Sequence, residues 1–216
     1  MATTMTAENT LLAQARSCLS REDCLTLYAH WATTYNEDLA DASQNYVAPI
    51  IVAETALKSS NYTKGTILDA GCGTGLVGEA LARGGATTID GLDLSPAMLK
   101  VAESTGVYRN LMLGDLTQKI EKPDEAYDMV TCVGTFTQGH VGPDPALREF
   151  VRVTKKDGLI VATILDEIWL SGGYKAEVEK LEAEGLVDVI SVELKDYIIA
   201  RRDRASVIVL RKKGTT

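Results

Sequence analysis

The chain has 216 residues, 45% of them hydrophobic, and a formal net charge of −8 at pH 7. This length and composition predict one domain with a single substantial core. The acidic balance argues against a nucleic-acid partner, because such binding depends on lysine and arginine side chains that neutralise phosphates.

Other bulk features concern location and metals. Residues 1–10 lack the basic start and apolar run of a signal peptide, and no stretch approaches the ~20 apolar residues of a membrane span. We therefore expect a soluble, cytoplasmic protein with no membrane partner. The four cysteines, Cys18, Cys24, Cys72 and Cys132, form no C-x-x-C pair, which predicts reduced thiols and no metal site.

The order of the predicted elements indicates the fold class. Helical spacing occupies 11–44, a helix is predicted over 45–58, and short apolar strands then alternate with helices. The strands are predicted at 66–70, 87–94, 110–115, 127–133 and 159–164, and the helices at 76–83, after Ser95-Pro96 and after Asp144-Pro145, where Ser95 and Asp144 are expected to act as N-caps. This alternation predicts an α/β fold: a doubly wound, Rossmann-like, mostly parallel sheet.

The C-terminal part departs from this alternation. A helix is predicted from Tyr174 to Gly185, followed by strands at 187–194 and 206–212. The short connection between the two strands leaves no room for a crossover helix, so one of them is expected to be antiparallel.

The stretch LDAGCGTGLVG (68–78) resembles a nucleotide-binding turn between a strand and a helix. Read from Gly73 it fits G-x-G-x-x-G, a weak signal that dinucleotide enzymes share. Asp69, just before the glycines, would repel a pyrophosphate and attract a sulfonium. No Gly-Lys-Ser/Thr follows, which excludes a Walker-type loop. The charge favours S-adenosylmethionine, with a nicotinamide dinucleotide as the alternative.

Acidic residues at the next two strand ends agree with a nucleoside ligand. Asp93 is placed to accept both ribose hydroxyls. Asp115 is placed to accept a hydrogen bond from an adenine amino group, and the Leu116 backbone N–H is placed to donate one to an adenine ring nitrogen. Met98 is expected either against the adenine face or in the helix core.

These segments resemble the signature segments of the class I S-adenosylmethionine-dependent methyltransferases. The resemblance covers about residues 26–164 and rests on ILDAGCGTG, GLDLSPAML, GDL and YDMVTCVG. More narrowly, YAHWATTYNEDL, GVYRNLMLGDL and VTKKDGLIVATI are similar to the methyltransferase-like proteins related to the Williams–Beuren syndrome region methyltransferase. The resemblance implies a seven-stranded sheet whose last strands include an antiparallel hairpin.

The resemblance also implies a cofactor site. The glycine turn would line the methionine part, Cys132 and Val133 would flank the cofactor, and the aromatic N-terminal segment would fold over it. We expect residues 1–45 to form a helical lid on a methyltransferase domain over 46–216. The predicted cofactor-binding residues are Tyr28, Trp31, Tyr35, Asp69, Gly71, Cys72, Gly73, Gly75, Asp93, Leu94, Met98, Gly114, Asp115, Leu116, Cys132 and Val133.

The acceptor is predicted less directly. His140 is the one natural base in the loop 134–145, and it is either a catalytic base or a loop residue without a role. The predicted acceptor-binding residues are Thr135, Phe136, Trp169 and Tyr174. The loop lacks the Asn-Pro-Pro-Tyr type of segment of amino-group nucleic-acid methyltransferases. We therefore favour a small-molecule acceptor whose oxygen, nitrogen or sulfur nucleophile takes the methyl group by in-line displacement. A protein acceptor, or nucleotide binding without methyl transfer, as a partner or a sensor, remains an alternative. We expect a monomer or a homodimer.

Overall fold

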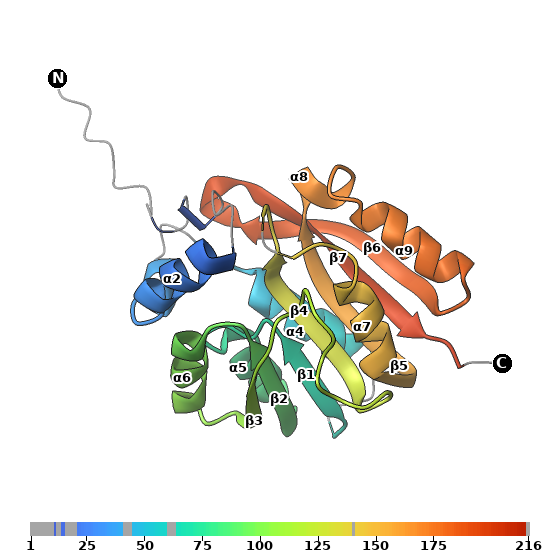
Figure 1. Cartoon of the computed structure of the whole chain (residues 1–216), viewed down its shortest axis with the longest axis horizontal. Coiled ribbons are helices and arrows are strands. Elements are labelled where there is room, and N and C mark those ends of the chain that lie inside the picture. The colour runs from blue at the N-terminus through green and yellow to red at the C-terminus, as the bar shows by residue number, and fades with distance from the viewer. Residues whose placement is uncertain are drawn as a thin grey trace.

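The computed structural model describes residues 11, 14–15, 21–40, 45–59, 64–139 and 141–214. In this part of the chain, seven strands form one sheet in the order β3-β2-β1-β4-β5-β7-β6 (Figure 1). The strands are β1 (Thr66–Ala70), β2 (Thr88–Asp93), β3 (Tyr108–Leu113), β4 (Tyr127–Phe136), β5 (Thr154–Leu165), β6 (Val187–Ile198) and β7 (Asp203–Lys212). The helices are α2 (Arg21–Trp31), α3 (Tyr35–Ala40), α4 (Ala48–Lys58), α5 (Leu76–Arg83), α6 (Pro96–Ser104), α7 (Ala146–Val153), α8 (Asp166–Trp169), α9 (Tyr174–Ala183) and the 3₁₀ turn η1 (Ile199–Arg201).

The first five strands run parallel, as the alternation of strands and helices predicts. The central strands are apolar on both faces because helices cover both sides of the sheet. Helices α4 and α5 pack together on one side, and α7 and α9 on the other (Figure 1). In α7, Leu147, Phe150 and Val151 lie at helical spacing and are buried against the sheet.

The C-terminal hairpin confirms the antiparallel expectation. Strand β7 is antiparallel to both β5 and β6, and η1 with Arg202 forms the short connection between β6 and β7. Arg202 adopts a left-handed conformation with φ of 58°. The predicted fold class, a mostly parallel Rossmann-like sheet with an antiparallel C-terminal strand, is therefore confirmed.

Two helix starts differ in their chemistry. Ser95 caps α6 as expected, because its Oγ accepts a hydrogen bond from the Met98 N–H at 3.4 Å. Asp144 does not cap α7: Pro145 occupies the N-cap position, and no side chain accepts a hydrogen bond there. Among the helices of the described ranges, none combines the length and apolar content needed to cross a membrane.

Candidate functional site

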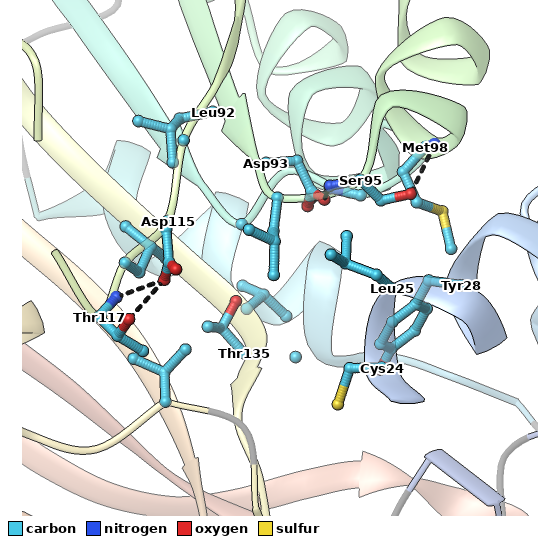
Figure 2. A pocket seen from close by; sticks show the side chains of 18 of the residues that line it. Cys24, Leu25, Tyr28, Leu92, Asp93, Ser95, Met98, Asp115, Thr117 and Thr135 are labelled. Carbon is cyan, nitrogen blue, oxygen red and sulfur yellow. Dashed lines mark hydrogen bonds between the residues drawn. The ribbon is translucent and has the colours of Figure 1, made fainter. Parts of the chain in front are cut away.

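A pocket lies at the carboxyl ends of strands β1 to β4, as expected for an open parallel sheet (Figure 2). Helix α2 closes the side that faces β2 and α6. The lining residues come from helices α2, α3 and α6, from the carboxyl ends of β2 and β4, and from the loops after β1 to β4: Cys24, Leu25, Tyr28, Tyr35, Gly71, Gly73, Leu92, Asp93, Leu94, Ser95, Met98, Gly114, Asp115, Leu116, Thr117, Val133, Gly134, Thr135, Gly139 and Val141.

The glycine turn follows β1 and presses against the end of β4. A Cβ at Gly71, where φ is 72°, would lie 2.1 Å from Thr135 Oγ1, so only glycine permits this approach. A Cβ at Gly73 would meet no atom within 4 Å, because that residue faces the pocket. The turn is therefore packed tightly against Thr135 at Gly71, and its backbone is open to the pocket at Gly73.

Asp93 connects the turn to the end of β2. One carboxylate oxygen accepts from the Gly73 N–H and the other from the Ser95 N–H, each at 2.8 Å. Burial raises the pKa of Asp93 above its ordinary value, although these backbone bonds oppose the shift. Since a carboxylate oxygen accepts more than one hydrogen bond, both oxygens retain capacity for a pair of ligand hydroxyls.

Asp115 is the second acidic residue of the pocket wall and lies just after β3. Its Oδ1 accepts from the Thr117 N–H at 2.9 Å and from Thr117 Oγ1 at 2.7 Å (Figure 2). This turn places Gly114, Asp115 and Leu116 together on the pocket wall. Met98 is buried in α6 and also lines the pocket.

The wall from α2 depends on Trp31, which is fully buried and does not line the pocket. Its indole N–H donates to Asp38 at 2.7 Å. The ring stacks on Tyr28 with centroids 6.2 Å apart and meets the edge of Tyr35 at 4.6 Å. Trp31 thus positions the two tyrosines that line the pocket rather than contacting a ligand.

Asp69 lies beneath the glycine turn and is fully buried. Its carboxylate accepts from the Tyr108 hydroxyl at 2.7 Å and from Thr131 Oγ1 at 3.2 Å. Burial raises the pKa of Asp69 to about 7, against the opposing effect of these hydrogen bonds. The side chain does not line the pocket, so the acidic character of the pocket wall comes from Asp93 and Asp115.

Other predicted site residues also lie outside the pocket wall. Cys132 and Phe136 are fully buried within β4, and Cys72 is buried under the turn. Gly75 packs against Tyr108, and Trp169 packs against the core. Tyr174 lines a second, neighbouring cavity. His140 lies outside the described residues, although Gly139 and Val141 on either side of it in the sequence line the pocket.

Charge and metal-binding capacity narrow the class of ligand. Within the described ranges, the charged side chains that line the pocket are the two aspartates, with no lysine or arginine. A cationic ligand is therefore favoured over a pyrophosphate. In the same ranges, no three histidine, cysteine or acidic side chains gather as metal ligands would.

Several lining residues were not predicted from the sequence. Cys24 and Leu25 precede Tyr28 by four and three residues, so helical spacing alone places them on the face that Tyr28 shares. Ser95 was expected only as a helix N-cap, and no role was predicted for Thr117. Gly134 lies near the hydroxyls of Tyr46 and Tyr197, which hydrogen-bond at 3.2 Å, and no local signal indicates that approach.

Comparisons with known proteins agree with this geometry. A family model described as a methyltransferase domain matches residues 67–158. Human methyltransferase-like protein 27 is 33% identical over 169 residues, which are 75% of this chain and 67% of that protein. The ubiquinone biosynthesis O-methyltransferase of Sodalis glossinidius (strain morsitans) is 35% identical over 133 residues, 57% of this chain and 52% of that protein. The chain thus spans about half the length of this second relative.

Solved structures share the fold. The [4+2]-cyclase SpnF superposes with a TM-score of 0.69 at 17% identity, covering 91% of this chain and 97% of that one. A candidate S-adenosyl-L-methionine-dependent methyltransferase of Methanococcus maripaludis superposes with a TM-score of 0.61 at 20% identity, covering 87% and 94%. At these identities the likeness concerns the fold alone.

Proposed function

This chain belongs to the class I S-adenosylmethionine-dependent methyltransferases, and from that premise we propose that it transfers a methyl group from S-adenosylmethionine to a small-molecule acceptor. The proposal rests on the two acidic residues that line the pocket at the ends of β2 and β3. Asp93 accepts a hydrogen bond from the glycine turn that follows β1, and Asp115 lies one strand further along the sheet. The described lining of this pocket has no basic side chain.

The pocket residues suit each part of this cofactor. Asp93 would accept the two ribose hydroxyls, and Asp115 with the Leu116 backbone would hold the adenine beside Met98. The turn at Gly71 and Gly73 would receive the methionine part, since a Cβ at Gly73 would point into open space. The rings of Tyr28 in α2 and Tyr35 in α3 would face the cationic end of the ligand, where an aromatic face favours positive charge.

When bound, S-adenosylmethionine supplies a methyl group that is already activated by its sulfonium. The residues that line the pocket would hold this methyl group in line with the acceptor atom. The proton of a hydroxyl acceptor then passes to His140 or to water. The chain contributes orientation and exclusion of water, which can account for much of the rate.

An oxygen acceptor is favoured by the relatives named as ubiquinone biosynthesis O-methyltransferases. A second candidate function is ligand binding without methyl transfer, because the fold is shared with a protein named as a [4+2]-cyclase. A shared fold does not fix the reaction. The two functions differ in whether S-adenosylhomocysteine accumulates in the presence of an acceptor.

Calorimetric titration tests the cofactor. We expect the protein to bind S-adenosylmethionine and S-adenosylhomocysteine, and NADH not at all. Asp93→Ala removes the proposed ribose acceptor and should weaken S-adenosylhomocysteine binding at least tenfold, about the loss of one or two hydrogen bonds to a charged group. Asp166→Ala is the matched control, since Asp166 is exposed and outside the pocket. Binding of NADH alone, or equal effects of both substitutions, would refute the assignment.

A further inference from the structure

A second cavity, of about 390 Å³, lies between the loop that follows β4 and the turn that joins α8 to α9. Gly139 and Val141 line both this cavity and the cofactor pocket, so the loop after β4 is their common wall. The two spaces are therefore neighbours. Neither the family model nor the named relatives assign a ligand to the second one.

The wall of this cavity carries polar groups without charge. Thr137 and Gln138 come from the loop after β4, and Ser171 comes from the turn between the helices. Ile168 and Tyr174 supply apolar surface. Among the described residues that line it there is no aspartate, glutamate, lysine or arginine.

The charged residues nearest in sequence do not alter this surface. Asp166 and Glu167 directly precede Ile168, but both are exposed and neither lines the cavity. A charged ligand would therefore gain no ionic partner from the described wall, where Gln138 and Ser171 are exposed. The Gln138 amide can donate hydrogen bonds to a neutral polar ligand and accept them from it. The Ser171 hydroxyl donates to the Glu167 carbonyl at 2.9 Å and can still accept a hydrogen bond.

Tyr174 fixes the shape of the shared wall. Its hydroxyl donates to the Val141 carbonyl, and its ring packs on Phe136 with centroids 5.1 Å apart. The side chain is almost fully buried, so it is held between the core of β4 and the loop. The common wall is thus anchored to α9 at the point where the two cavities meet.

We propose that the second cavity binds the methyl acceptor, and that the acceptor is a small, uncharged molecule that carries a hydroxyl group. This inference rests on the proposed function, because it assigns the acceptor to the space beside the cofactor pocket. It excludes carboxylates, phosphates and ammonium compounds as preferred acceptors. It also predicts that Gln138 and Ser171, on the two sides of the cavity, determine which acceptor binds.

The test uses three para-substituted phenols of similar shape and different charge: p-cresol, 4-hydroxybenzoate and tyramine. Each is titrated into the full chain after saturation with S-adenosylhomocysteine. We expect p-cresol to bind at least tenfold more tightly than either charged phenol. The first saturation step is itself the test of the cofactor assignment. Its failure would contradict the proposed function, whereas failure at the phenol step would contradict this inference alone.

Charge substitutions then locate the binding. Ser171→Asp and Gln138→Glu each add a carboxylate to one side of the cavity and should shift the preference from p-cresol to tyramine. Leu170→Asp is the matched control, because Leu170 is 71% exposed, adjacent to Ser171 and outside the cavity lining. The inference is overturned if no phenol binds, if a charged phenol binds the unaltered chain as tightly as p-cresol, or if all three variants behave alike.

Discussion

Replacing Asp69 with asparagine should remove a pH-dependent penalty from the folded state. Asp69 is fully buried, and its folded pKa of about 7 lies above the unfolded value of about 3.9. Between these two values the folded chain retains a proton that the unfolded chain has lost. Stability therefore falls as pH rises through this window and levels off above the folded pKa.

The size of the effect follows from the two pKa values. Linkage gives a destabilisation of about 1–2 kcal/mol at about pH 5 and about 4 kcal/mol at about pH 8, an increase of about 2–3 kcal/mol. Asparagine has nearly the same shape, and its amide can donate to the Tyr108 hydroxyl or to Thr131 Oγ1, the two groups that contact Asp69. Asp69→Asn should therefore gain stability over the unaltered chain as pH rises.

Urea denaturation followed by circular dichroism at several pH values measures this difference. Asp128, whose pKa is lowered by its hydrogen bond from Lys155, contributes alike to both chains. The comparison therefore isolates Asp69 together with the nearby charge of Asp93, which contributes to the raised pKa of Asp69. Asp166→Asn, at an exposed position, should show no growing difference. Parallel stability curves for the unaltered chain and Asp69→Asn, or a growing advantage for aspartate above about pH 5, would refute the reasoning.

Three further predictions follow from the site. Gly78→Ala should destabilise the fold by about 1–3 kcal/mol, because the added Cβ would lie 2.3 Å from the Tyr108 hydroxyl. Thermal unfolding should show that adding Tyr108→Leu restores part of this stability, and no restoration would contradict the contact. Tyr174→Phe removes the hydrogen bond to the Val141 carbonyl and should raise KM for the acceptor several-fold while the affinity for S-adenosylhomocysteine stays constant. Steady-state kinetics and calorimetry measure the two quantities, and an equal weakening of acceptor and S-adenosylhomocysteine binding would contradict the prediction. His140→Gln should lower kcat for a hydroxyl acceptor by about 10²–10⁴-fold with unchanged cofactor binding if His140 is the base, and an unchanged kcat would assign it no catalytic role.

Strand ends explain why much of the pocket was predictable from the sequence. Parallel strands bring their carboxyl ends to one edge, so residues directly after successive strands must meet there. Asp93 is the last residue of β2, Asp115 follows β3, and both line one pocket. The glycine turn follows β1 by the same logic.

Side-chain direction explains what the sequence did not indicate. Asp69 belongs to the same strand end as the glycines, but it lies within β1 and points under the turn, toward Tyr108 and Thr131. Those partners come from β3 and β4, so no local pattern predicts them. Trp31 similarly shares a segment with Tyr28 and Tyr35 but faces the core, where it supports both rings.

The glycine pattern itself shows why a motif can fit two ligand classes. Gly73 opens onto the pocket, whereas Gly78, the third glycine of the same G-x-G-x-x-G pattern, faces the ring of Tyr108. Gly75 and Gly91 also lie against this ring, whose hydroxyl reaches Asp69. The third glycine therefore permits close packing between α5 and β3 and carries no information about the ligand. In dinucleotide-binding folds the third glycine likewise serves helix–strand packing, so it cannot separate the two classes. The side chains on the pocket wall must do so, and here they are the acidic Asp93 and Asp115.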